Sequence, residues 1–153
     1  PHALESLSES LLIKHQCGLD NLEKVKSEYE SRNIEAEVLE FFNNPEEQIK
    51  WSDFVVSRAG ALSLSEITSM KKGALMIPLP NSIDNHQYEN AKKIEDMGMG
   101  ILHEEDEDIS YLTDKLNEII KDKKYINWKK NELTIHVNAA NEIVKHIEQY
   151  LNK

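Results

Sequence analysis

A central stretch of the chain, Asp53–Ala91, alternates short apolar runs with helical segments at close spacing. Phe54–Val56 is a continuous apolar strand of the kind that parallel sheets bury on both faces. A second such run, Ala74–Ile77, is closed by Pro78. Helical patterns between and after these runs complete a βαβ unit, which places both strands in one parallel sheet. Ligands of such sheets bind at the carboxyl ends of the strands, so the polar residues at that edge are the first candidates for function.

The same alternation extends in both directions along the chain. It predicts further strands over 11–15, 34–42 and 101–102, and helices over 1–8, 19–32, 61–71, 85–97 and, after an acidic run, 109–120. Asn44 and Pro45 are the expected cap and first residue of a short helix, and a last helix has its apolar face between Ile135 and Leu151. The fold class is therefore α/β, a parallel sheet with helices on both faces, in a single domain over residues 1–153.

Composition restricts the classes of function. Apolar residues make up 39% and charged residues 30%, as in a globular protein, and no apolar run approaches the roughly 20 residues of a membrane span. The net charge of -10 argues against nucleic acid as a partner, because nucleic acid phosphates favour clustered Lys and Arg. A single cysteine, Cys17, excludes an internal disulfide, and the first residues carry no signal-peptide pattern, so the cytoplasm is the expected compartment.

Glu66 is the first candidate for a ligand contact. Ser63 and Glu66 have the spacing of a capping box, in which Ser63 caps the helix and Glu66 reaches back to a free backbone amide. Alternatively, a carboxylate at the head of this helix accepts hydrogen bonds from two vicinal hydroxyls, as offered by a ribose. These residues by themselves leave both interpretations open.

The tetrapeptide Arg58–Ala61 joins the buried strand to that helix. Gly60 is expected to let the backbone turn tightly and to let a ligand approach it closely. The helix start adds unpaired amides and a partial positive charge that suit anions. A glycine in such a loop also serves packing alone, and the chain contains no G-x-G-x-x-G or P-loop pattern.

A denser group of polar residues opens the next helix. Asp84 and Gln87 again have capping spacing, but capping leaves His86 and Asn90 unexplained. Several hydrogen-bonding side chains on the first turns of one helix suit a sugar, whose hydroxyls need donors and acceptors at fixed positions. His86 could act as a general base, although no neighbouring residue in the sequence would orient it.

The remaining reactive side chains have plainer interpretations. His15 is expected to be a satisfied histidine at the end of a strand, and the acidic run Glu104–Asp108 a solvated approach to a helix. Trp51 and Trp128 are expected in the core or at a docking surface. No Cys/His spacing suggests a metal, and none is expected.

In order along the chain, the motifs HQCG, EFFNN, SRAGALSLSEI, IPLP and DNHQYENA resemble the C-terminal half of the MurG family. Members of this family belong to glycosyltransferase family 28 and are bacterial GlcNAc transferases that convert lipid I to lipid II in peptidoglycan synthesis. The resemblance covers essentially all of the chain. It implies the Rossmann-like, UDP-GlcNAc-binding C-terminal domain of a GT-B glycosyltransferase.

The resemblance also implies a set of residues that bind UDP-GlcNAc. Phe42 would lie in the segment whose backbone recognises uracil, and Glu66 would bind the ribose hydroxyls. Leu62 and Ser63 would lie along the nucleotide, and Arg58 and Gly60 would shape the turn. The side facing GlcNAc and the diphosphate would be formed by His86, Gln87 and Asn90. The family often has Gln-Gln where this chain has His86-Gln87, so Gln87 is the firmer of the two assignments.

The implied reaction is an inverting transfer, in which the acceptor hydroxyl displaces UDP at the anomeric carbon of the sugar. Helix amides would stabilise the leaving diphosphate, so UDP-GlcNAc is needed as the donor and no metal or other cofactor is expected. No catalytic residue is assigned to this chain, because the family's expected base and its contacts with lipid I lie in an N-terminal acceptor domain. The full-length protein is expected to be peripheral at the inner face of the bacterial plasma membrane.

The chain departs from the family pattern at its N-terminal end. The family's C-terminal domain opens with a strand and a Gly-rich loop that grips the diphosphate, and neither motif is found before the first predicted helix. In a sheet ordered 3-2-1-4-5-6 that strand is central, so the strands beginning near Leu11 and Phe54 are expected to lack the neighbour between them. We therefore expect an incomplete donor-binding fragment that is inactive alone. The alternatives are a donor subunit that pairs with a separate acceptor-binding protein, and a non-catalytic module that binds a nucleotide-sugar or a protein.

Overall fold

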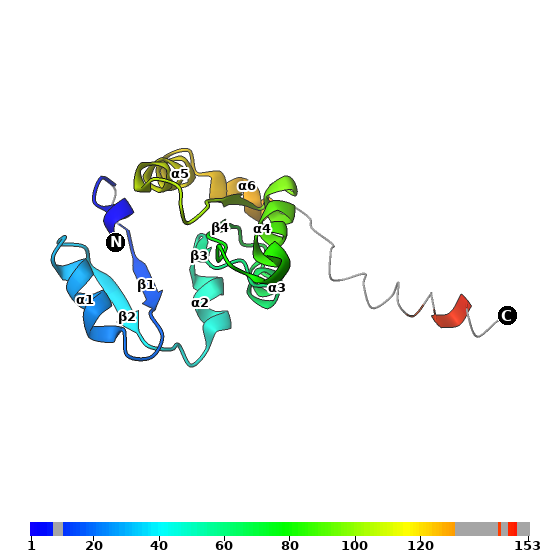
Figure 1. The fold of residues 1–153 in the computed structure, drawn as a ribbon, viewed down its shortest axis with the longest axis horizontal. Helices are drawn as coiled ribbons and strands as arrows, with labels where there is room; N and C mark the ends of the chain where they lie inside the picture. The colour runs from blue at the N-terminus through cyan, green and yellow to red at the C-terminus, as the bar shows by residue number, and fades with distance from the viewer. Residues whose placement is uncertain (8–10, 131–143, 145–146, 150–153) are drawn as a thin grey trace.

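The computed structural model describes residues 1–7, 11–130, 144 and 147–149. Strands and helices alternate along the chain, as Figure 1 shows. In order they are η1 (His2–Leu4), β1 (Ile13–Gln16), α1 (Leu22–Glu30), β2 (Ala36–Leu39), α2 (Pro45–Trp51), β3 (Val55–Ser57), α3 (Ala61–Ser69), β4 (Ala74–Met76), η2 (Ile83–Asn85), α4 (His86–Asp96), β5 (Gly100–Leu102), α5 (Ile109–Lys121) and α6 (Lys124–Lys130).

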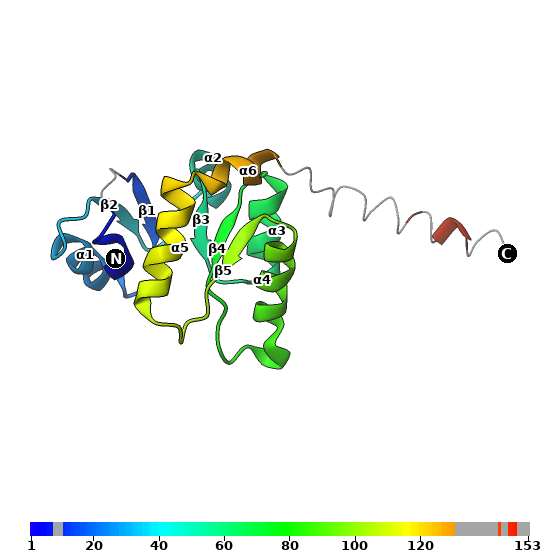
Figure 2. The same ribbon diagram turned by 90° about the horizontal axis from the view of Figure 1, so that it is seen from above.

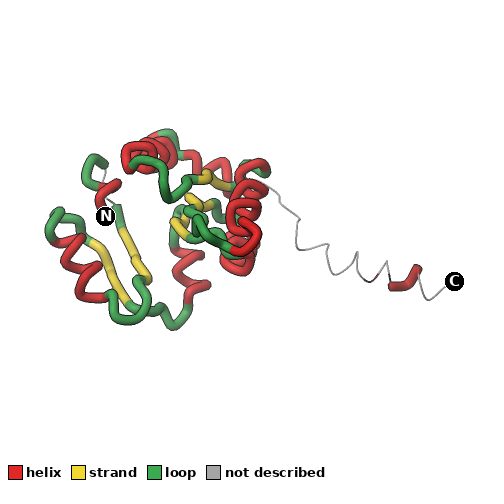
Figure 3. The backbone as a smooth tube through the Cα atoms, in the orientation of Figure 1, coloured by secondary structure: helices red, strands yellow, loops and turns green. Residues whose placement is uncertain are grey.

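All strand pairs in the described part of the chain are parallel. β1 pairs with β2, and β3, β4 and β5 form a second sheet in that order. Within the described residues β1 and β3 are edge strands of separate sheets, which agrees with the expectation that these two strands lack a common neighbour. The two sheets are seen apart in Figure 3, with α2 connecting them.

The core is built around β4, whose residues are all buried. Ala74 and Met76 point to one face and contact buried residues of α3 and α4, whereas Leu75 points to the other face, toward α5 and α6. Full burial of a side chain such as Leu75 contributes roughly 1.5–3 kcal/mol. Helices thus cover both faces of the β3–β5 sheet, as Figure 2 shows from above, and the predicted α/β fold class is confirmed.

α1 covers the smaller sheet. Val38 is buried between the exposed residues Glu37 and Leu39, so the predicted alternation of β2 is confirmed. Tyr29 of α1 is buried and contacts the His15 ring edge to face, and its hydroxyl lies 3.0 Å from His15 Nδ1. His15 is therefore a satisfied histidine, as expected.

Two expectations for the fold are wrong. Val56 in β3 is 51% exposed, not buried on both faces, because β3 is an edge strand in the described chain and no helix covers that residue. The N-terminal residues form only the short 3-10 helix η1, although Ala3 is buried and Leu4 and Leu7 contact the core beside α5, on the side predicted to be apolar. The predicted helix between Ile135 and Leu151 lies largely outside the described residues.

Candidate functional site

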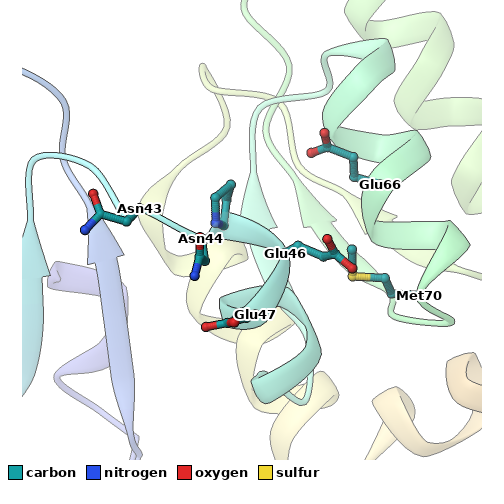
Figure 4. A pocket seen from close by; sticks show the side chains of 7 residues that line it. Asn43, Asn44, Glu46, Glu47, Glu66 and Met70 are labelled. Atoms are coloured by element: carbon teal, nitrogen blue, oxygen red, sulfur yellow. The ribbon is translucent and has the colours of Figure 1, made fainter.

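A pocket of about 430 Å³ opens between the start of α2 and α3, and Figure 4 shows it from close by. Glu66 and Met70 line it from α3, and the segment that follows β2 lines it from the other side. Its lining residues are Asn43, Asn44, Pro45, Glu46, Glu47, Glu66 and Met70. The pocket thus brings Glu66 next to the EFFNN segment, although the two are far apart in the sequence.

Glu66 is not part of a capping box, so that interpretation was wrong. α3 begins at Ala61, because the Leu64 amide donates to the Gly60 carbonyl at 3.0 Å and makes Gly60 the N-cap. Ser63 therefore lies within the first turn, and Glu66 one turn further on is exposed. Its carboxylate accepts no hydrogen bond from any group in the described part of the chain, which leaves it available to hydroxyls.

Space beside Gly60 is the notable feature of the α3 start. Gly60 has φ -66° and ψ 137°, which other residues also adopt, so the expected tight turn that requires glycine is wrong. A Cβ added there would meet only the Ser63 hydroxyl, at 3.9 Å. The helix has no side-chain cap, and Leu62 on its first turn is 82% exposed. Its first amides are therefore open to an anion, and the absence of a Cβ leaves room for close approach.

Arg58 is engaged within the protein. Its guanidinium donates to both Glu105 carboxylate oxygens, at 2.6 and 3.2 Å, and to the carbonyls of Ile77 and Pro78, at 3.3 and 3.5 Å. The hydrogen bond from Arg58 lowers the pKa of Glu105 below its ordinary value, and the charge of Arg58 adds to this. One guanidinium thus joins the loops that follow β3, β4 and β5 at the carboxyl edge.

The start of α4 does not have the predicted cap. Asp84 and Asn85 both have positive φ, 49° and 55°, and Asn85 is the N-cap without a side-chain hydrogen bond. Asp84 and Gln87 therefore form no capping box. Gln87 instead accepts a hydrogen bond from the Leu79 amide at 3.1 Å, since its side chain turns back to the loop that follows β4.

Two further residues of α4 were candidates. Asn90 donates to the Ala59 carbonyl at 3.2 Å, which fastens α4 to the loop before α3 and gives Asn90 the structural explanation that its sequence pattern lacked. His86, the first residue of α4, is exposed.

Phe42 follows β2 and is partly buried. Its backbone amide donates to the Gln16 side chain at 3.1 Å, so the end of β1 holds the segment that the resemblance assigned to uracil. The adjacent Asn43 lines the pocket that contains Glu66.

The candidates therefore lie in two groups, one at the pocket and one at the carboxyl edge of the β3–β5 sheet. Glu66 lines the pocket, and Phe42 directly precedes the lining residue Asn43. Arg58, Gln87 and Asn90 form a hydrogen-bonded frame around the loops after β3 and β4. Gly60, Leu62 and Ser63 connect the groups along the start of α3.

Several residues around the candidate site were not predicted from the sequence. Glu105 belongs to an acidic run that was expected to be solvated, and its place in the loop after β5 was the signal that it could reach other loops at the carboxyl edge. Gln16, at the end of β1, gave the same signal. Met70 and Glu46 carried none, because only the packing of α2 beside α3 brings them to the pocket.

Beside Glu105 lies a second cluster of charged groups. His103 is buried, and its Nδ1 lies 3.1 Å from Glu107 Oε2 and 3.4 Å from Lys115 Nζ. Burial, followed by the charge of Lys115, lowers the pKa of His103 below 6.5. The hydrogen bond from Lys115 lowers the pKa of Glu107.

Two features are absent from the described part of the chain. No group of three or more His, Cys, Asp or Glu side chains there has the geometry of a metal site. None of the described helices is both long enough and apolar enough to cross a bilayer.

Comparison with known proteins gives a consistent result. The sequence profile of the glycosyltransferase family 28 C-terminal domain matches residues 1–149. A UDP-N-acetylglucosamine--N-acetylmuramyl-(pentapeptide) pyrophosphoryl-undecaprenol N-acetylglucosamine transferase from Wolbachia pipientis subsp. Culex pipiens (strain wPip) is 37% identical over 152 residues, which are 95% of this chain and 44% of that protein. The protein of the same name from Rickettsia bellii (strain RML369-C) is 40% identical over 141 residues, covering 87% and 39% of the two chains.

A solved structure agrees with these relatives. The crystal structure of Acinetobacter baumannii MurG superposes with a TM-score of 0.86 at 27% identity, and the match covers 97% of this chain and 46% of that one. The chain thus spans less than half the length of the curated relatives described above.

Proposed function

The chain belongs to glycosyltransferase family 28, as its C-terminal domain, and on this premise we propose that it binds the donor UDP-GlcNAc for an inverting N-acetylglucosaminyl transfer. The observation that supports this most directly is the pocket in which the Glu66 carboxylate, without a hydrogen-bond partner in the described chain, faces the segment after Phe42. A nucleoside needs groups of these kinds, namely an acceptor for ribose hydroxyls and backbone beside it for the base.

The α3 start would receive the diphosphate. Its first amides have no side-chain cap, and the positive end of the helix dipole favours an anion there. The space beside Gly60 allows phosphate oxygens to come close to the backbone. No metal is part of this proposal, because the amides themselves would stabilise the charge that develops on the leaving diphosphate.

Gln87 and Asn90 would contribute to the sugar side of the site mainly by fixing the shape of its backbone. Their hydrogen bonds hold the Leu79 amide and the Ala59 carbonyl, so they set the walls of the site even where they do not contact GlcNAc. His86, exposed at the start of α4, is the side chain of this group that a sugar reaches from solvent.

The rest of the reaction would come from polypeptide of the kind that the longer relatives carry. We propose lipid I as the acceptor, the base on the acceptor side, and a peripheral place at the inner face of the plasma membrane for the whole enzyme. The chain by itself would then transfer no GlcNAc to lipid I, and transfer by the isolated 153 residues would contradict this part of the proposal.

Binding is tested by NMR titration of the ¹⁵N-labelled chain with UDP and UDP-GlcNAc, together with saturation transfer to the ligands. Weak binding is expected, with uracil and ribose signals and shifts of amides in the pocket and at the α3 start. Glu66→Gln should weaken it at least about tenfold, since hydrogen bonds to a charged acceptor contribute roughly 1.5–3 kcal/mol. Glu30→Gln, an equal charge change at the end of α1, is the control and should bind as the unmodified chain does.

The outcomes separate the competing functions. No uracil or sugar signal would indicate a protein-binding module instead of a donor site. Equal affinity of the Glu66→Gln variant and the unmodified chain would show that the nucleoside lies elsewhere.

A further inference from the structure

Beyond the residues that would contact the donor, we infer that Glu105 is a positioning residue of the site. Its carboxylate fixes the Arg58 guanidinium where it bridges the loops that follow β3 and β4, an arrangement called the strap below. Arg58 is then not free to bind phosphate. This inference rests on the proposed donor-binding function.

The geometry of Arg58 supports this role of Glu105. Its guanidinium makes a two-pronged contact with Glu105, in which both carboxylate oxygens accept hydrogen bonds, at 2.6 and 3.2 Å. The other two contacts, to the carbonyls of Ile77 and Pro78, are longer, at 3.3 and 3.5 Å. Charge-assisted, forked pairs are the strong and directional ones, so Glu105 fixes the guanidinium, and the carbonyls are held through it.

The Ile77 and Pro78 carbonyls lie next to a wall of the site. Ile77 and Pro78 immediately precede Leu79, whose amide donates to the Gln87 side chain at 3.1 Å. A displacement of this backbone would therefore move the partner of Gln87 and, with it, the wall at the start of α4. On the other side, Arg58 adjoins Ala59, whose carbonyl accepts from Asn90 at 3.2 Å. Arg58 thus lies at the junction of both hydrogen-bonded walls.

The charges of the pair also favour a positioning role. Paired with a carboxylate, Arg58 offers an approaching diphosphate little net positive charge, so the anion-binding groups of the edge are the backbone amides of α3. If Arg58 were the phosphate ligand, Glu105 would compete with the donor, and removing its charge would strengthen binding. If Arg58 is a strap, removing that charge weakens binding. The two roles predict opposite signs.

The ion pair is also placed so that it can be removed without unfolding the chain. The Arg58 and Glu105 side chains are 47% and 45% exposed, and pairs exposed to this degree contribute little to stability. A change of affinity in a variant whose melting temperature is within about two degrees of the original therefore reports positioning and not loss of structure.

The test compares Glu105→Gln, Arg58→Lys and the double variant in the full 153-residue chain, with UDP as the probe in NMR titrations. Lysine keeps the charge but loses the fork. Each single variant should bind UDP about threefold to tenfold more weakly, and the double variant no more weakly than the worse single variant, because both residues act as one unit. Without ligand, both single variants should shift the amides of Leu79 and Gln87. Glu104→Gln, the neighbouring exposed glutamate of the same acidic run, is the control and should match the unmodified chain.

Three results overturn the inference. Unchanged or tighter UDP binding by Glu105→Gln, with the unmodified chain binding normally, rejects the strap and leaves the donor site standing. A drop of many degrees in the melting temperature of Glu105→Gln shows a merely structural pair. Absence of UDP binding by the unmodified chain rejects the proposed function, and the role of Glu105 falls with it.

Discussion

Replacing Gly60 by alanine separates what the start of α3 needs for folding from what a ligand needs there. The backbone at Gly60, φ -66° and ψ 137°, is accessible to alanine, and the new methyl group would have only the Ser63 hydroxyl near it, at 3.9 Å. The substitution should therefore cause no clash within the described chain. It should instead fill the space through which an anion would approach the first amides of the helix.

The expected change in stability is the difference of two small terms. Alanine is a poorer N-cap than glycine, which costs up to about 1 kcal/mol. Alanine also narrows the unfolded ensemble, which stabilises the fold by about 0.4–1 kcal/mol where the native backbone suits it. The net change in the free energy of unfolding should be below about 1 kcal/mol, so the melting temperature should move by less than roughly 4 °C.

The expected change in binding is larger. A methyl group directed at the diphosphate should weaken UDP binding about tenfold or more, which corresponds to at least about 1.4 kcal/mol. Thermal denaturation followed by circular dichroism gives the first quantity, and NMR titration with UDP the second. Gly100→Ala is the contrast, because its Cβ would lie 2.5 Å from the Ala74 carbonyl in the centre of the sheet and should destabilise the fold.

Two results would refute this reasoning. Normal UDP affinity in Gly60→Ala would mean that the ligand does not come close to Gly60. A clear loss of stability in the same variant would mean that the space beside Gly60 is filled in solution, contrary to the open surroundings of its backbone.

Further predictions concern the frame of the site and the fold that carries it. Gly73→Ala should lower stability by about 1–3 kcal/mol, because the added methyl group would overlap the buried Trp128 ring; an unchanged melting temperature would contradict this. Asn90→Ala should cost about 1 kcal/mol by removing the hydrogen bond to the Ala59 carbonyl, measured by urea denaturation, and a stability equal to the original would show that water replaces it. Burial lowers the pKa of His103, so the stability that its neutral form provides is present above pH 6.5 and is lost as the pH falls below that value. His103→Gln should flatten the fall of the free energy of unfolding with pH over this window. Equal pH slopes for the variant and the unmodified chain would rule this contribution out.

Much of the fold could be predicted because the patterns that define it are local. The apolar run Ala74–Ile77 became the fully buried β4, and Pro45 stands at the first position of α2. Leu116 and Ile119 of α5 are buried in the core, as their spacing predicted. A helix or strand that buries one or both faces has a characteristic spacing of apolar residues, and this spacing can be recognised without knowing which element packs against it.

The arrangement of the candidate site follows from the sequence only in part. β3 and β4 are parallel neighbours in one sheet, so the residues that follow them had to lie at the same edge. β2 belongs to the other sheet, and the segment that follows it reaches Glu66 only through the placement of α2. Which residue would cap α3 was undecided, because Gly60 and Ser63 are both acceptable N-caps. Burial of Leu64 and Ile67, together with the bond from Leu64 to Gly60, selects the earlier start and so frees Glu66 from any capping role.

The sequence by itself determined the order of strands and helices, their parallel arrangement and the edge at which polar groups gather, since each follows from hydrophobic period and chain connectivity. Tertiary structure alone decided which polar groups are engaged within the protein. Glu105 reaches Arg58 across 47 positions, and Asn90 reaches Ala59 across 31, and no local rule relates such residues. Hydrogen-bond partners depend on distances in space, and those distances exist only once the sheets and helices have packed.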